Sequence, residues 1–363
     1  MSKQKNKIHI NGHQIRNTPL FLSLSLEKKK REQKKKKINL KMDILTHTLQ
    51  AMADKVDFEY IEVWMEDYVD IPVIATMLYL LLVLYVPRHV MQDRPAFNLR
   101  STNLKWNLFL TVFSFIGAYY CVPRLWQVLT ADVLPSVSPA GLAAFIATQP
   151  GGRPTPSLLR HAVYEEGKSA MPIGIAGSFD TSVCVWHPEV YRRGVVGLMC
   201  LAFAFSKIPE MFDTVLLVLQ KKRFPFLHWY HHTTVMLYCW HAFIVPTPAG
   251  VWFATMNFVV HAIMYFYYFL TSCGLTKQLR PFAPLITFLQ IAQMAVGTYI
   301  SIYSYSKYLF GDGCDWTPSN MKLCLLMYTS YAYLFGEFFF KRYIAKPPAA
   351  SPTTDAKKVK AVC

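Results

Sequence analysis

Residues 194–220 read GVVGLMCLAFAFSKIPEMFDTVLLVLQ, an apolar stretch that contains three ionisable residues, Lys207, Glu210 and Asp213. A helix of about 20 apolar residues spans the hydrocarbon core of a bilayer. Ionisable side chains inside such a span are costly and usually functional. Their spacing of three keeps them on one side of a helix, which Pro209 bends. We therefore predict a membrane helix with a polar site. The alternative, a buried ion pair between Lys207 and a carboxylate that holds two helices together, remains open.

Further apolar segments surround this one, and 53% of all residues are hydrophobic, a high share for a soluble protein. The sequence therefore predicts an all-α integral membrane protein with seven transmembrane helices around an interior cavity. The other six predicted spans are 71–86, 108–126, 228–245, 251–271, 283–305 and 321–343.

Three of these spans carry polar stripes. His228, His231 and His232 share one face of the fourth span, because residues three and four apart are neighbours on a helix. The fifth and sixth spans repeat this spacing with other polar residues, although amides can also simply join membrane helices. Stripes on four consecutive spans favour one shared interior site. The remaining stripe residues are Asn257, His261, Tyr265, Tyr268, Gln290 and Gln293.

Charge divides the chain into three parts: a basic disordered leader (1–42), a membrane domain (43–345) and a basic tail (346–363). Residues 1–41 carry 13 Lys and Arg against 2 Glu. We interpret the leader as solvated, not as a nucleic-acid site, and translation starting at Met42 is an open alternative. Loops rich in Lys and Arg alternate with loops that are balanced or lack them. Because basic loops stay in the cytosol, this pattern predicts a cytosolic C-terminus and a lumenal loop at 127–192.

Cys184 and Cys314 both fall in loops on the predicted lumenal side, an oxidising space. A disulfide between them is one hypothesis, and two free thiols are the other. The eight cysteines form no CxxC pair, so we expect no metal framework.

Two chemistries suit histidines inside a membrane. Di-iron desaturases and hydroxylases need several histidine boxes, whereas residues 228–261 supply five histidines, in one box and two single positions. Acyl transfer needs an imidazole as nucleophile or base, which a carboxylate can orient. The sequence favours acyl transfer, and a seven-span receptor or transporter is the alternative from a different class.

Four strings resemble the ELO family of very-long-chain fatty-acid elongases: KIPEMFDT (207–214), HWYHH (228–232), HAIMYFYY (261–268) with Asn257, and TFLQIAQ (287–293). The resemblance implies a 3-ketoacyl-CoA synthase of the endoplasmic reticulum with seven spans around a substrate tunnel. This enzyme condenses acyl-CoA with malonyl-CoA and needs no cofactor. The HWYHHTTV form (228–235) resembles the subfamily acting on saturated and monounsaturated chains.

The resemblance also implies roles. His231 would be the nucleophile, His261 would assist malonyl decarboxylation, and His228 and His232 would position His231. Glu210 and Asp213 would hydrogen-bond these imidazoles, and Lys207 would engage the substrate. Lys221, Lys222 and Arg223 are candidates for the nucleotide end of CoA. Asn257, Tyr265, Tyr268, Gln290 and Gln293 would line the cavity. Expected partners are membrane lipid and the reductase, dehydratase and enoyl reductase of the cycle, and a homodimer is left open.

Overall fold

The computed structural model describes residues 19–131, 162–163, 174–186, 191–310 and 313–345. The chain forms two units, Met1–Val56 and Asp57–Cys363. In the first, Pro19–Ala53 is one continuous helix, α2, where the sequence predicted a disordered leader through residue 42. Residues 28–37 consist of Lys, Arg, Glu and Gln, all good helix formers, with no Gly or Pro to end the helix. The basic tail 346–363 lies outside the described residues.

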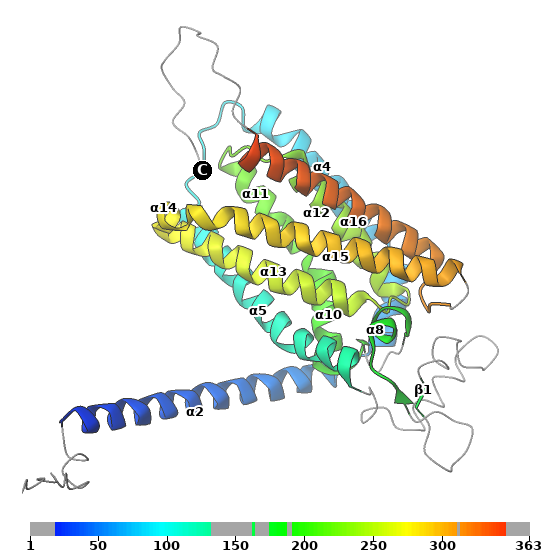
Figure 1. Ribbon diagram of the computed structural model, residues 1–363. Coiled ribbons are helices and arrows are strands. Elements are labelled where there is room, and N and C mark those ends of the chain that lie inside the picture. The colour runs from blue at the N-terminus through cyan, green and yellow to red at the C-terminus, as the bar shows by residue number, and fades with distance from the viewer. Residues whose placement is uncertain (1–18, 132–161, 164–173, 187–190, 311–312, 346–363) are drawn as a thin grey trace, which may run out of the picture. The chain divides into compact units, whose positions relative to one another are not determined.

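The second unit is almost entirely helical (Figure 1). Among the described residues it contains one sheet, which pairs two strands of two residues, β1 and β2. The long helices coincide with the predicted spans within a few residues at most ends, although α5 begins earlier than expected. The elements are α3 Phe58–Asp67, α4 Asp70–Leu84, α5 Arg100–Thr130, β1 Ala162–Val163, β2 Gly174–Ile175, α8 Phe179–Cys184, α10 Gly194–Ser206, α11 Phe212–Leu219, α12 Phe226–Ile244, α13 Gly250–Leu270, α14 Thr276–Leu279, α15 Ala283–Leu309 and α16 Pro318–Phe339.

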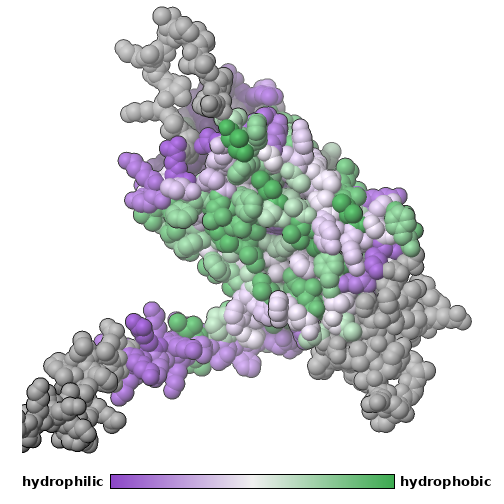
Figure 2. Space-filling view, in the orientation of Figure 1, coloured by the Kyte–Doolittle hydropathy of each residue, from purple (hydrophilic) through white to green (hydrophobic). Residues whose placement is uncertain are grey.

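Length and composition identify several membrane-crossing stretches in the described residues. Three helical stretches are long and apolar enough to cross a membrane by themselves: Arg100–Thr130, Gly250–Leu309 and Pro318–Ile344. If each of the bent helix pairs α3–α4 and α10–α11 counts as one span, there are up to five such stretches. The stretch Gly250–Leu309 reverses direction near Gly274, whose φ of 103° favours glycine (Figure 1). Hydrophobic residues gather over the middle of the helices and hydrophilic ones towards their ends (Figure 2). The chain is therefore a multi-pass membrane protein.

Basic residues collect at one end of the bundle, which we call the basic end. It contains the ends of α4, α11 and α16 and the α13–α15 turn (Figure 1). Hydrogen bonds join its loops: Lys221 Nζ donates to Gln92 O over 2.9 Å, and Arg100 Nε donates to Ser272 O over 3.2 Å. The basic residues there are Arg88, Arg94, Arg100, Lys105, Lys221, Lys222, Arg223, Lys277, Arg280, Lys341 and Arg342.

A disulfide lies at the opposite end, which we call the disulfide end. It joins Cys184, the last residue of α8, to Cys314, before α16, with a Cα–Cα distance of 4.5 Å. This is the pairing that the sequence suggested. The backbone N–H of Asp315 donates to Cys184 O over 2.8 Å, and Trp186 N–H donates to the Asp315 carboxylate over 3.0 Å. These contacts attach α8 to the start of α16.

Arg192, just before α10, also joins helices at this end. It forms an ion pair with Glu62 of α3, donates to the carbonyls of Phe243 and Val245, and stacks on Trp186. Burial lowers the pKa of its guanidinium to about 10, so it stays charged at neutral pH. Arg192 therefore connects α3 and α10 to the end of α12.

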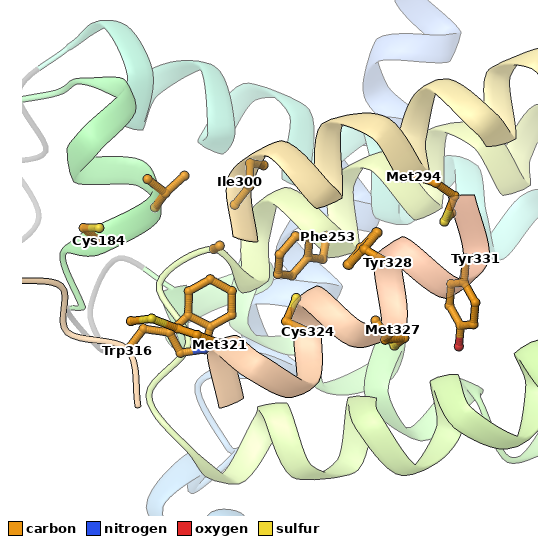
Figure 3. Packing of buried hydrophobic residues seen from close by; sticks show 12 residues of the cluster. Cys184, Phe253, Met294, Ile300, Trp316, Met321, Cys324, Met327, Tyr328 and Tyr331 are labelled. Atoms are coloured by element: carbon orange, nitrogen blue, oxygen red, sulfur yellow. The ribbon is translucent and has the colours of Figure 1, made fainter. Parts of the chain in front are cut away.

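The largest buried cluster extends along α16 from Trp316 to Tyr331 (Figure 3). Phe253 of α13 and Met294 and Ile300 of α15 pack against it. An apolar interior thus extends from the disulfide end towards the middle of α12.

We predict that Cys184 and Cys314 are protected from alkylation until the protein is reduced. Mass spectrometry of the denatured protein, alkylated before and after reduction, should show two additional labelled thiols, both at these positions. Cys273, which is exposed and free, should be labelled under both conditions and is the internal control. Full labelling of Cys184 and Cys314 without reductant would contradict the disulfide.

Candidate functional site

The site is built around the break in the third predicted span. Pro209 has no backbone N–H to donate, so α10 ends at Ser206. A 3-10 turn, Pro209–Met211, leads into α11, and the two helices are bent by 41°. Lys207 and Asp213, on the two sides of the break, both contact the polar stripe of α13, and Glu210 pairs with Lys207.

Lys207 and Glu210 form a buried ion pair. Lys207 Nζ lies 2.7 and 3.0 Å from the two carboxylate oxygens of Glu210 and 3.3 Å from Asn257 Oδ1 on α13. Ser206 Oγ donates to Glu210 over 2.7 Å. Lys207 and Glu210 are 2% and 3% exposed, so both charges depend on these partners. The structure therefore contains a buried ion pair, but it lies within the broken span and does not join two spans, as the alternative left open by the sequence required.

Asp213 accepts two hydrogen bonds from other helices. Trp106 Nε1 of α5 donates over 2.6 Å, and the Tyr265 hydroxyl of α13 donates over 2.7 Å. The expectation that Glu210 and Asp213 bond to imidazoles is wrong for this structure, since neither carboxylate accepts from a histidine among the described residues. Glu210 instead pairs with Lys207, which lies three residues away, and Asp213 accepts from donors on α5 and α13.

Three of the four histidines of α12, His228, His231 and His232, lie together. The ring centroids of His228 and His232 are 4.7 Å apart, and those of His231 and His232 are 5.5 Å apart. His232 is buried, whereas His228 and His231 are half-buried. Tyr331 of α16 lies against His231, with ring centroids 5.0 Å apart. The predicted histidine face therefore exists, and His231 keeps accessible surface.

His261 continues the polar stripe of α13. Its Nε2 lies 3.1 Å from Asn257 Nδ2, and its ring meets that of Tyr265 edge-on at 5.4 Å. Since α10 contacts both α12 and α13, the broken span brings His231 and His261 into one site.

The other predicted residues differ in position. Gln293 is buried, Gln290 donates to Met264 Sδ over 3.3 Å, and Tyr268 is 42% exposed at the margin of the stripe. Lys221 has a positive φ of 54° and ends α11, so part of its role is structural. Lys222 and Arg223 are exposed at the basic end.

The sequence did not identify four residues of the site: Tyr79, Trp106, Tyr331, and Thr214 as a hydrogen-bond partner of a histidine. The Tyr79 hydroxyl of α4 lies 2.8 Å from Thr214 Oγ1, which lies 2.9 Å from His228 Nε2. A lone Tyr or Trp in an apolar span is a usable signal, because its polar atom needs a partner when buried. Which partner it finds depends on helix packing.

These groups can perform nucleophilic or acid–base chemistry. A neutral imidazole with free surface is a nucleophile and a base near neutral pH. The ion pair and the Asp213 hydrogen bonds fix the helices that carry the imidazoles, and such preorganisation is how sites position reacting groups.

Comparison with known proteins gives a family match over most of the chain. The model of the GNS1/SUR4 (ELO) family matches residues 64–351. Fatty acid elongase 3 of Trypanosoma cruzi is 49% identical over 296 residues, which cover 81% of this chain and 90% of the relative. Fatty acid elongase 3 of Trypanosoma brucei brucei is 42% identical over 299 residues, covering 82% and 91%. Very long chain fatty acid elongase 4 of Trypanosoma cruzi is 39% identical over 319 residues, covering 87% and 96%.

The buried ion pair yields a test of stability. We predict that Lys207→Met and Glu210→Leu each lower the apparent melting temperature in detergent by several degrees, because each leaves one uncompensated buried charge. The double variant Lys207→Met/Glu210→Leu should recover most of the loss. The apparent melting temperature is measured by heating the detergent-solubilised protein and determining the remaining folded fraction by size-exclusion chromatography. The exposed Lys277→Met is the control. Additive losses in the double variant would contradict the pairing.

Proposed function

The chain belongs to the GNS1/SUR4 (ELO) family and is a fatty-acid elongase, and we propose that it condenses a long-chain acyl-CoA with malonyl-CoA. The products would be CO2, CoA and a 3-ketoacyl-CoA two carbons longer. We propose saturated or monounsaturated chains, from the HWYHHTTV string at 228–235. The observation that carries the proposal is the half-buried His231 beside a second histidine, above an apolar interior.

In the first half-reaction, an imidazole nitrogen of His231 attacks the thioester carbon of acyl-CoA. The bond from this carbon to sulfur breaks, the acyl group stays on the imidazole, and CoA leaves with the imidazole proton as its thiol. The adjacent rings of His228 and His232 would position His231 in this step. Tyr331, which contacts both His231 and the apolar cluster, lies where the acyl chain would enter that cluster.

In the second half-reaction, malonyl-CoA loses CO2, and the electrons of the broken C–C bond form an enolate. The enolate carbon attacks the acyl carbon, the bond from this carbon to the His231 nitrogen breaks, and the released imidazole takes up one proton from water, which restores His231. His261, oriented by Asn257, would stabilise the enolate oxygen. Lys207, which donates to the same Asn257, supplies a positive charge that would attract the malonyl carboxylate.

The nucleotide part of CoA carries phosphates, and the exposed Lys222 and Arg223 would bind them at the basic end, with Lys221 beside them. The residues lining the cavity would be Asn257, Tyr265, Tyr268, Gln290 and Gln293. The proposed reaction uses only the two thioester substrates, so we propose no cofactor and no metal.

We further propose seven spans around a substrate tunnel. Gly250–Leu309 contributes two of them, because it reverses near Gly274. The helix α12 would be a further span: its histidines lower its hydropathy, and it packs against α4, α10 and α16. The basic end would face the cytosol together with the C-terminus, in the endoplasmic reticulum membrane.

A 3-ketoacyl-CoA must be reduced, dehydrated and reduced again before a saturated chain results. We therefore propose that the protein works beside a ketoacyl-CoA reductase, a dehydratase and an enoyl reductase within the membrane lipid. A homodimer is compatible with this arrangement.

The function is tested with a panel of acyl chains. Microsomes that contain this protein, supplied with labelled malonyl-CoA and acyl-CoAs from decanoyl to docosanoyl, should form products two carbons longer. We expect activity with saturated and monounsaturated chains and no inhibition by an iron chelator, which would inhibit a desaturase. Intact, membrane-inserted protein that gives no product with any chain would overturn the proposed function.

The nucleophile is tested separately. We predict that His231→Ala abolishes condensation, because no acyl-imidazole can form, while the protein remains folded and inserted. His241→Ala, ten residues along the same helix, is the matched control and should retain most of the activity. Labelled acyl-CoA should leave acyl label on the wild-type protein and on the control but none on His231→Ala. Substantial residual turnover by His231→Ala would assign the nucleophile to another histidine.

A further inference from the structure

Tyr79 is a buried polar residue that the proposed reaction does not use. It lies on the inner face of α4, 3% exposed, packed with Val83, Met211 and Met236. Its ring centroid is 6.2 Å from that of His232. The first span therefore contacts the histidine cluster directly.

The hydroxyl of Tyr79 begins a chain of three polar groups. It lies 2.8 Å from Thr214 Oγ1, and this oxygen lies 2.9 Å from His228 Nε2. Thr214 is fully buried, so these three groups satisfy one another without solvent. Two contacts, one through the hydroxyl and one through the ring, thus connect Tyr79 to His228 and His232 of α12.

We propose that Tyr79 and Thr214 are positioning residues that hold His228 as a neutral imidazole with its proton on Nδ1, an inference that rests on the proposed condensing function. The hydroxyls can be arranged in two directions. If Tyr79 donates to Thr214 and Thr214 donates to His228 Nε2, both hydroxyl protons are used. In the reverse direction, the Tyr79 proton has no acceptor among the described residues, and such a buried unpaired donor is costly.

The tautomer of His228 matters because the imidazoles lie so close together. A neutral His228, 4.7 Å from His232, adds no positive charge next to the ring that flanks His231. A protonated His228 would oppose the positive charge that forms on His231 when its nitrogen attacks the thioester. In a site shielded from water, this repulsion is much stronger than in solution.

Other charged groups lie around the relay and contribute to any pH dependence. They come from α12, the broken span, α13 and α16: His231, His232, Lys207, Glu210, Asp213, His261 and Tyr331. Variants at Tyr79 or Thr214 leave all of these side chains in place. A matched set of such variants therefore tests the relay itself.

The test compares Tyr79→Phe and Thr214→Val, which remove one hydroxyl each and keep the shape, with Thr214→Ser, which keeps the hydroxyl. Tyr119→Phe, an exposed position on α5, is the control. We expect Tyr79→Phe and Thr214→Val to lower kcat about tenfold with little change in KM for acyl-CoA. The double variant should be no worse than Thr214→Val, because both changes break one relay.

The pH–rate profile separates positioning from general destabilisation. A hydroxyl that donates to Nε2 stabilises the neutral imidazole, so its loss should move the acidic limb of the profile to higher pH. Thr214→Ser and Tyr119→Phe should keep the wild-type profile. Wild-type kcat and pH profile in Tyr79→Phe would overturn the relay alone. An inactive, folded wild-type protein would overturn the proposed function and this inference with it.

Discussion

A proline inside a membrane helix imposes the constraint on which this structure depends. At Pro209 the third span loses a backbone hydrogen bond and bends, and polar side chains on both sides of the break contact neighbouring helices. Lys207 reaches α13, Asp213 reaches α5 and α13, and Thr214 reaches α4 and α12. The break makes a single span the common partner of four others.

This arrangement is stable only as a whole. Lys207, Asp213 and Thr214 of the broken span each have a partner on another helix, and an unpaired buried charge costs several kcal/mol. Polar groups in apolar surroundings therefore specify which helices are adjacent and in which register. The same contacts orient the imidazoles, since His228 is bonded to Thr214, and His261 to Asn257, which also accepts from Lys207. Structural and catalytic organisation share one set of side chains.

The sequence predicted most of the helices, because their apolar lengths and their Pro, Gly and basic boundaries are local properties. It also predicted the histidine face of α12 and the stripe of α13, which follow from helical spacing. Glu210 was assigned to imidazoles, although its partner Lys207 lies only three residues away. The other failures depend on a second helix: Asp213 was assigned to imidazoles, and Tyr79 and Trp106 were not recognised as polar partners. Each of these contacts joins residues far apart in the chain, such as Trp106 and Asp213, and no local pattern encodes it. The helical leader α2 is the opposite case, since local helix propensity was decisive and was underestimated.

The two ends of the bundle differ in a way that constrains how substrate moves. At the disulfide end, α8 packs over α13 and α15: Trp252 donates to Ser182 over 2.9 Å, Tyr303 donates to Asp180 over 2.8 Å, and Phe179 lies against both aromatic rings. The bond from Cys184 to Cys314 fixes this segment to α16. At the basic end, exposed lysines and arginines can attract phosphates. In the proposed mechanism, an acyl chain that extends from His231 into the apolar cluster would point towards the disulfide end, and CoA would bind at the basic end. Both substrates would then enter from the basic end, and the lengthened product would leave by the same route, because α8 is attached to α13, α15 and Cys314 at the other end.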